Sequence, residues 1–154
     1  MDLYLLRHAE AGVAPRDADR ELTANGLAQA GAVAAGINWL DLGLTGIISS
    51  PLPRARQTAQ PVARIIALLV ETNEVLAPGH SAADALALVT ERAGRLLLVG
   101  HEPQLSGIIR LVTGGCVRMR KAMLVALELP VAGSAQGSLA WALSWRHLQR
   151  LGRT

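Results

Sequence analysis

The segment RLLLVGHEP, residues 95–103, has four consecutive large apolar side chains, followed by a glycine, a histidine and a proline-containing turn. A run that is apolar on both faces is typical of a strand in a parallel sheet covered by helices on each side. Apolar residues then recur at helical spacing, namely Leu105, Ile108, Ile109 and Val112, until the glycine pair at 114–115. The segment therefore predicts a central strand, a polar turn and a helix, the repeating unit of α/β folds.

Strand and helix patterns alternate along the rest of the chain. Strands are predicted at residues 2–6, 46–49, 72–76 and 95–99, and two more at 123–129 and 139–145, joined by a loop over 130–138. Helices are predicted at residues 23–37, 54–69, 81–92 and 104–113. We expect an α/β fold, a three-layer α/β/α sandwich with a mostly parallel central sheet and antiparallel strands near the C-terminus. No linker or repeat divides the chain, so residues 1–154 should form one domain.

Several helix positions carry local signals. Thr23 and Ser81 are expected to cap the first and third helices. Leu27 should face the core together with the apolar residues that follow it at helical spacing. Pro61 lies inside the predicted helix 54–69 and should kink or divide it, because proline lacks the N–H that the helix needs.

The composition restricts the class of protein. Apolar residues make up 51% of the 154 residues and phenylalanine is absent, so the core must consist of Leu, Val, Ile and Ala. Cys116 is the single cysteine, which excludes an intrachain disulfide and argues against a cysteine-based metal site. The apolar runs are too short to span a membrane, and the first residues lack a signal-peptide pattern. We therefore expect a cytoplasmic protein that does not contact a membrane.

The formal net charge is +3, and Lys121 is the only lysine. The basic residues are scattered, except for the run at 118–121 and the arginines at 146, 150 and 153. Nucleic-acid binding would require a denser basic stripe with interleaved aromatic residues, so we expect none. The run at 118–121 has two interpretations: it contacts an acidic partner surface, or it is simply a solvated charged surface.

Polar and charged side chains follow three of the predicted strands. The first strand ends in Arg7 and His8, the second leads through Ser-Ser-Pro to Arg54, and strand 95–99 leads to His101. Because the carboxyl ends of parallel strands meet at one edge of a sheet, these side chains should surround one pocket. The arginine fork matches two phosphoryl oxygens, and helix N-termini add N–H donors. The pattern indicates phosphate chemistry.

Four segments resemble the signatures of the histidine phosphatase superfamily, the phosphoglycerate-mutase-like family, and among its members the small SixA-like phosphohistidine phosphatases. They are LRHAE at 6–10, with Ala9 in place of the usual glycine, RELTANG at 20–26, SSPLPRARQTA at 49–59 and VGHEP at 99–103. The resemblance extends from residue 2 to about residue 129 and keeps the family's motif order.

The resemblance implies a role for each matching residue. His8 would be the nucleophile that is transiently phosphorylated, while Arg7, Arg54 and His101 would form the phosphate pocket and take part in catalysis. Arg20 would form the rim of the pocket. Guanidiniums near His8 should lower its pKa below the usual value of about 6.5 and keep the ring neutral. Since the guanidiniums neutralise the phosphate, we expect neither a metal nor a cofactor.

The substrate prediction depends on the proton donor. Larger family members use a carboxylate after the third strand, but residues 76–81 contain none, and the next acid is Asp84. His80 is a second candidate donor. An alkoxide leaving group needs a proton, whereas imidazole leaves far more readily, so we expect hydrolysis of phosphohistidine on a protein carrier domain. Two alternatives stay open: a small-molecule phosphomonoesterase and an inactive phosphate-binding or interaction module. Monomer and dimer are equally compatible with the sequence.

Other polar residues near the motifs are assigned structural roles. Ser50 is expected to cap a helix rather than act as a nucleophile. Arg56 should point away from the pocket, since it lies two residues along a helix from Arg54. Glu10 stays open, because it lies beside the pocket but would repel phosphate if it faced inward. His80 and His147 are expected at the surface.

Overall fold

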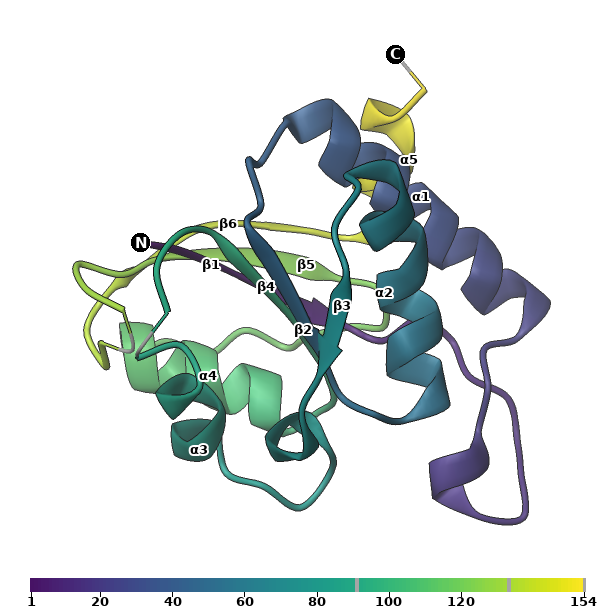
Figure 1. Cartoon of the computed structure of the whole chain (residues 1–154), viewed down its shortest axis with the longest axis horizontal. Helices are drawn as coiled ribbons and strands as arrows, with labels where there is room; N and C mark the ends of the chain where they lie inside the picture. Colours follow the sequence, from purple (N-terminus) through teal and green to yellow (C-terminus); the bar gives the residue numbers. More distant parts are fainter. Residues whose placement is uncertain (91, 133, 154) are drawn as a thin grey trace.

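A six-stranded sheet with the order β3-β2-β4-β1-β5-β6 forms the centre of the computed structural model, which describes residues 1–90, 92–132 and 134–153 (Figure 1). The strands are β1 (Asp2–Arg7), β2 (Gly46–Ser49), β3 (Val70–Thr72), β4 (Leu96–Gly100), β5 (Leu124–Glu128) and β6 (Ser138–Leu143). The first four strands pair in parallel, and the β1–β5 and β5–β6 pairs are antiparallel. The predicted α/β class and mixed sheet are confirmed.

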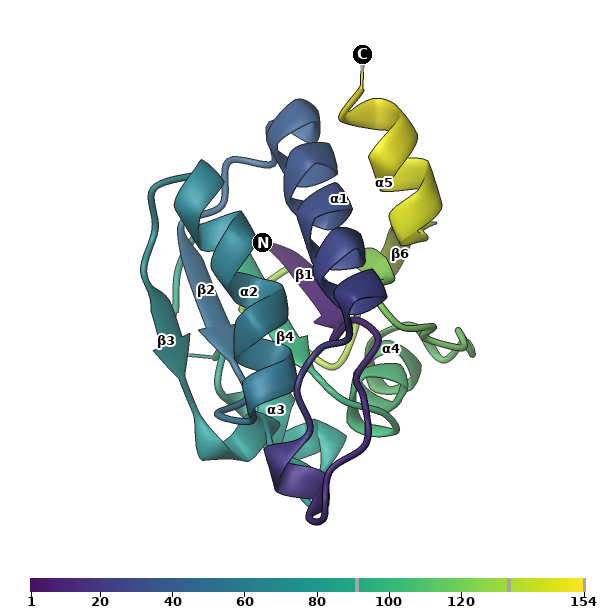
Figure 2. The same ribbon diagram turned by 90° about the vertical axis from the view of Figure 1, so that its right-hand side faces the viewer.

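Helices cover both faces of the sheet (Figure 2). One face packs against α1 (Ala24–Leu40), α2 (Pro53–Ile65) and α5 (Trp145–Leu151). The opposite face packs against α3 (Ala82–Ala87) and α4 (Gln104–Thr113). Two 3-10 helices, η1 (Asp17–Asp19) and η2 (Glu74–Leu76), lie in the connections. The result is the three-layer arrangement that the alternating sequence pattern predicts.

The strands at the centre of the sheet are apolar on both faces because each face lies under helices. In β1, Leu3 and Leu5 belong to the core under α3 and α4, whereas Tyr4 and Leu6 belong to the core under α1, α2 and α5. The side chains of a strand alternate between faces, so both halves of the core draw on the same short segment. This burial holds β1 and β4 at the centre of the sheet.

The strand register aligns the polar residues that follow the strands. Arg7 pairs with Gly100 across β1 and β4, and Ser49 pairs with Val99 across β2 and β4. The next residues, His8, Ser50 and His101, therefore leave the sheet at one edge. This is the edge at which open α/β sheets form their ligand sites.

The predicted caps at Thr23 and Ser81 are confirmed, but the N-cap of α2 is Leu52, without a side-chain cap hydrogen bond, so the cap predicted at Ser50 is wrong. The Thr23 hydroxyl accepts a hydrogen bond from the Gly26 N–H at 3.0 Å, and Ser81 forms a reciprocal capping box with Asp84. Leu27, however, is 54% exposed, so its predicted core position is wrong. The first turn of α1 packs through Gly26 against the backbone of Glu10, where an added Cβ would lie only 2.0 Å from the carbonyl oxygen.

The third strand begins at Val70 instead of residue 72 and ends at Thr72. The side chain of Asn73 accepts a hydrogen bond from the Val75 N–H at 3.0 Å and starts η2 there, which ends the strand. The preceding helix is shorter than predicted, because α2 ends at Ile65 and Ala67 adopts a left-handed backbone with a φ of 55°.

Pro61 does not divide α2, which runs continuously from Pro53 to Ile65. Residues on both sides of the proline, Ala59 and Val62, are fully buried, and this packing holds the two halves of the helix on the sheet. The third helix, predicted over 81–92, ends at Ala87, although Val89 is still fully buried. Residue 91 in that prediction and residue 133 in the predicted loop lie outside the described residues.

The last helix, α5, is absent from the sequence prediction, which extended a strand to residue 145. Instead, β6 ends at Leu143, and Ser144 forms a capping box with His147 that starts the helix. Leu148 of α5 is fully buried against α1. Gly36 makes this contact possible, since a Cβ there would lie 2.6 Å from the Leu148 Cβ.

Candidate active site

His8 follows β1 directly and is 5% exposed. Its backbone N–H donates to the Gly100 carbonyl at 3.1 Å, and its ring Nδ1 lies 2.7 Å from the Ala9 carbonyl oxygen. Because a carbonyl oxygen can only accept, Nδ1 carries the ring proton and Nε2 carries the lone pair. Burial, and to a lesser extent the charges of Arg54 and Arg7, lower the pKa of His8 to about 4. The imidazole is therefore neutral at pH 7.

His101 follows β4 and is 4% exposed. Its ring centroid lies 5.1 Å from that of His8, with the planes tilted by 52°. Burial, with the neighbouring His8 and Arg54, lowers the pKa of His101 to about 3. The register of β1 and β4 thus brings two neutral imidazoles together at the sheet edge.

Ser50 is the hydrogen-bond partner of the His101 ring. Its Oγ lies 2.8 Å from His101 Nε2 and accepts a hydrogen bond from the Leu52 N–H at 3.3 Å. When the Ser50 hydroxyl donates to Nε2, the ring proton of His101 is on Nδ1. This Nδ1 is buried and has no hydrogen-bond partner among the described residues. Ser50 thus contacts His101 instead of capping α2, whose N-cap is Leu52.

Arg54 lies in the first turn of α2 and is 3% exposed. Its Nη1 donates to the backbone carbonyl of Asp17 at 2.7 Å, and its Nη2 donates to the Asp17 carboxylate at 3.0 Å. Thr58 links the same helix to the segment after His8, because its hydroxyl donates to the Arg54 carbonyl and accepts from the Ala9 N–H. These contacts hold the guanidinium beside the two histidines.

Arg7 is the last residue of β1. Its Nη1 donates to the Met119 carbonyl at 2.8 Å, and burial lowers the pKa of the guanidinium. The Nε atoms of Arg7 and Arg54 are both buried without a hydrogen-bond partner among the described residues. Together with His101 Nδ1, they give the sheet edge three buried nitrogen atoms without a hydrogen-bond partner among the described residues, although buried polar atoms are ordinarily paired.

Arg20, predicted at the rim, is held through Asp17. Its Nε donates to the Gly12 carbonyl at 2.8 Å, and its Nη1 reaches the Asp17 carboxylate at 3.1 Å. Asp17 therefore bridges Arg20 and Arg54, and the arginine contacts hold the pKa of its carboxyl below the usual range. The sequence analysis did not single out Asp17. Its spacing of three residues before Arg20 was the available signal.

Among the described residues, Glu10, Asp84 and His80 form no hydrogen bond or ion pair with His8, Arg7, Arg54 or His101. The Glu10 carboxylate accepts from the Thr23 hydroxyl at 2.7 Å and from the Asn25 amide at 3.0 Å. Asp84 accepts from the backbone N–H and hydroxyl of Ser81 in the cap of α3. His80 is exposed, as predicted. The site is consequently rich in cations and neutral donors, an environment that suits a tetrahedral oxyanion.

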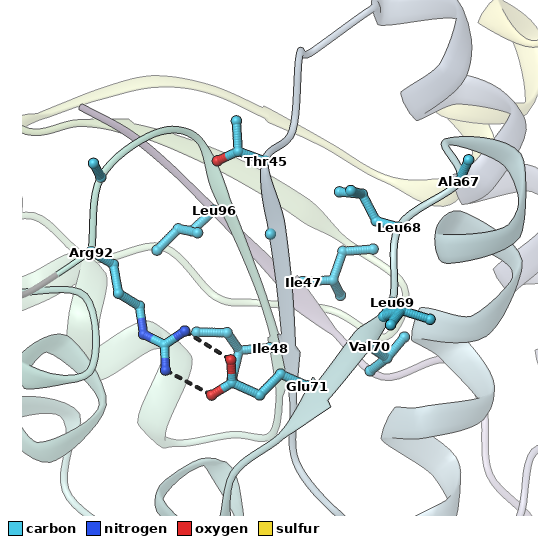
Figure 3. Close-up of a pocket in the computed structure, with 12 residues that line it drawn as sticks. Thr45, Ile47, Ile48, Ala67, Leu68, Leu69, Val70, Glu71, Arg92 and Leu96 are labelled. Carbon is cyan, nitrogen blue, oxygen red and sulfur yellow. Dashed lines mark hydrogen bonds and ion pairs between the residues drawn. The ribbon is translucent and has the colours of Figure 1, made fainter.

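Several cavities hollow the surface of the molecule. One of about 830 Å³ lies beside β2 and β3, where apolar side chains surround the ion pair between Glu71 and Arg92 (Figure 3). It contains none of the predicted site residues. A second, of about 450 Å³, borders Glu102, which follows His101, and Arg118, whose charge influences Arg7. No group of three or more His, Cys, Asp or Glu side chains in the described ranges is placed to hold a metal ion.

Comparisons with known proteins identify the family of the chain. The family model of the histidine phosphatase superfamily (branch 1) matches residues 3–78, which include Arg7, His8 and Arg54. An uncharacterized protein of Picosynechococcus sp. (strain PCC 7002) is 34% identical over 140 residues, which span 83% of this chain and 85% of that protein. The chain belongs to the histidine phosphatase superfamily. The predicted family is thereby confirmed.

Solved phosphatase structures have the same fold. The protein histidine phosphatase SixA complexed with tungstate is 24% identical, with a TM-score of 0.84, and the alignment covers 96% of this chain and 99% of that one. A mutant phosphoserine phosphatase from Entamoeba histolytica, in complex with phosphoserine, is 20% identical, with a TM-score of 0.76 and coverages of 96% and 98%. No helix in the described part of the chain is long and apolar enough to cross a membrane. Superfamily membership supports phosphatase activity.

Proposed function

We propose that this histidine phosphatase hydrolyses phosphohistidine on a protein and that His8 is the covalent nucleophile. The observation that carries the proposal is the arrangement around His8. Its Nε2 lone pair is free while Nδ1–H is bound to Ala9, and three unpaired buried donors lie on its neighbours Arg7, Arg54 and His101. A neutral imidazole enclosed by such donors is suited to attack a phosphoryl group and to stabilise its charge.

In the first step, His8 Nε2 forms a bond to phosphorus while the bond from phosphorus to the substrate nitrogen breaks. Arg7, Arg54 and the Nδ1–H of His101 stabilise the charge on the equatorial oxygens. The substrate imidazole, when its other nitrogen carries a proton, leaves as a neutral ring. No acid from the protein is then needed.

In the second step, water attacks the phosphorus of phospho-His8 and the Nε2–P bond breaks. The hydrogen bond from Nδ1–H to the Ala9 carbonyl keeps a proton on the ring, so His8 also leaves as a neutral imidazole. The proton of the attacking water passes to phosphate or solvent, and inorganic phosphate is released. Both steps thus use the same leaving-group chemistry.

The acids next to the site are already bound to the protein, which favours a phosphoramidate over an ester: Asp17 binds Arg20 and Arg54, and Glu102 binds Ser106. Asp84 caps α3, and Glu10 is bound to Thr23 and Asn25. An ester would release an alkoxide, which needs a proton in the transition state. The likeness to a phosphoserine phosphatase makes the small-molecule phosphomonoesterase the second candidate.

The test offers the purified protein a histidine-phosphorylated carrier domain and, separately, phosphoserine and a panel of sugar phosphates. We expect rapid loss of phosphate from the carrier and turnover of the esters at least about a hundredfold slower, because of the missing acid. The His8→Ala variant should lose about four orders of magnitude or more in rate. The Arg56→Ala variant is the matched control, since Arg56 is exposed on α2.

Faster turnover of the esters would replace the proposal with the phosphomonoesterase. Retention of a few per cent of the rate in His8→Ala would exclude His8 as the nucleophile. Failure of the wild-type protein on every substrate, with no phosphate trapped on His8, would favour the inactive phosphate-binding module.

A further inference from the structure

Two basic stretches that are separate in the sequence meet around one cavity beside the candidate active site. The cavity has a volume of about 420 Å³ and lies between the segment before β5 and the first turns of α5. Its basic lining residues are Arg118, Arg120, Arg146, His147 and Arg150, which we call the arginine surface. All five are exposed.

The charges of the arginine surface are not neutralised by ion pairs among the described residues. The ion pairs of the described residues join Arg16, Arg20, Arg54, Arg92 and Arg95 to carboxylates and include none of its four arginines. No acidic residue lines the cavity. Four like charges around one cavity create a positive potential that attracts anions.

The arginine surface is continuous with the wall of the active site. Met119 lies between Arg118 and Arg120, and its carbonyl accepts from Arg7 Nη1 at 2.8 Å. The N–H of Ala122 donates to the Arg7 carbonyl at 3.1 Å. Arg118 is close enough for its charge to lower the pKa of Arg7. A chain whose phosphorylated side chain enters the site can therefore extend over the arginine surface.

We propose that the arginine surface docks carboxylate side chains that flank the phosphohistidine of the protein substrate. Guanidinium forks bind carboxylates in a bidentate manner, and four of them distributed over two elements fit several acidic residues better than one small anion. Base stacking of a nucleic acid is disfavoured here, because Arg146 already lies over the Trp145 ring, 5.1 Å from its centroid. The inference rests on the proposed phosphohistidine substrate. It adds that the residues flanking the phosphohistidine in that substrate are acidic.

The experiment uses two synthetic peptides of equal length, each with one phosphohistidine, flanked on both sides by glutamates in one peptide and by glutamines in the other. Free phosphohistidine serves as a substrate too small to reach the surface. The test variant is Arg146→Gln/Arg150→Gln, which leaves Arg118 and Arg120 next to the site intact. The control Arg56→Gln/Arg64→Gln removes the same charge from exposed positions on α2.

For the wild-type protein we expect kcat/KM for the glutamate peptide to exceed that for the glutamine peptide by about tenfold at low salt, through KM. The preference should shrink as ionic strength rises, since exposed charge pairs are screened. The test variant should lose the preference and keep its rate on free phosphohistidine. The α2 control should keep both the preference and the rate.

Equal kcat/KM for the two peptides in the wild-type protein, or an equal loss of preference in both double variants, would overturn the docking surface and leave the phosphatase function intact. Failure of the wild-type protein on all three substrates would instead overturn the proposed function. Binding of the unphosphorylated glutamate peptide, measured by fluorescence polarisation, then tests the surface separately. Binding that depends on Arg146 and Arg150 supports it, and binding equal to that of the glutamine peptide contradicts it.

Discussion

The ends of β1 and β4 lie side by side, and each carries a buried histidine with a lowered pKa, but opposite nitrogens of the two rings are bound to the protein. In His8, the Ala9 carbonyl binds the Nδ1–H and leaves the Nε2 lone pair free. In His101, the Ser50 hydroxyl occupies Nε2 and leaves the Nδ1–H free. The same tautomer therefore offers a nucleophile at one strand end and a donor at the other, and the neighbouring group decides which.

The largest expected effect comes from removing each histidine in turn. His8→Ala should lower the rate by about four orders of magnitude or more and abolish the phosphoenzyme, because no nucleophile is left. His101→Ala should lower the rate by about two to three orders of magnitude, the usual effect of losing one oxyanion donor. Because His8 is intact in that variant, phospho-His8 should still form. Rapid-quench trapping of labelled phosphate under alkaline conditions measures both.

Either of two results would contradict the different roles assigned to His8 and His101. A phosphoenzyme in His8→Ala would show that another residue accepts the phosphate. Complete loss of the phosphoenzyme in a folded His101→Ala variant would show that His101 is needed for more than charge stabilisation.

Both histidines have a pKa lowered by burial, and this predicts a pH dependence of the free energy of unfolding. Their pKa values fall from 6.5 to about 4 for His8 and about 3 for His101 in the folded protein. Between pH 6.5 and 4, the unfolded chain therefore binds more protons than the folded one, so stability is lost as the pH falls through this window. Lowering the pH from 7 to 5 should reduce the free energy of unfolding by about 2 kcal/mol per histidine.

Urea denaturation at pH 7 and pH 5 measures this loss. A His8→Ala variant should show a smaller difference between the two pH values than the wild-type protein, because one of the two titrations is removed. Arg56→Ala should show the wild-type difference. An equal pH dependence in His8→Ala and the wild type would mean that His8 is not held neutral by burial.

Residues that act through their position along the chain were predictable, whereas residues that act through tertiary contacts were not. His8, Arg54 and His101 each follow a strand that the apolar pattern predicts, and parallel strand ends must meet at one edge. Asp17 gives no comparable signal, because its contact with Arg54 spans 37 residues. The contact of Ser50 with His101 spans 51 residues and depends on the register of β2 and β4.

The errors in the fold prediction also come from tertiary contacts. The strand predicted over 139–145 had suitable residues to its end, but Ser144 and His147 start a helix there, and packing of Leu148 against Gly36 stabilises it. Likewise, Pro61 should interrupt an isolated helix, but the burial of α2 on the sheet outweighs the loss of one hydrogen bond.

The smallest effect is expected from Ser50→Ala, which removes the hydroxyl that contacts His101 and has no counterpart at His8. In Ser50→Ala, the hydroxyl no longer holds Nε2 as an acceptor, so the ring proton of His101 can move away from Nδ1. We expect kcat to fall by about tenfold with little change in KM, the loss associated with one buried hydrogen bond. The ring ¹⁵N chemical shifts of His101 should change at the same time, a readout that a purely structural role would not move.

Ser49→Ala is the matched control for this substitution. Ser49 is fully buried beside Ser50, but its hydroxyl donates to the Ser50 carbonyl at 2.9 Å instead of to His101. It should leave kcat and the His101 ¹⁵N shifts near their wild-type values. If both variants lose the same activity, or if His101 keeps its Nδ1 proton in Ser50→Ala, the hydroxyl does not set the tautomer. Packing alone would then orient the His101 ring at the end of β4, whereas a hydrogen bond to the Ala9 carbonyl orients the ring of His8.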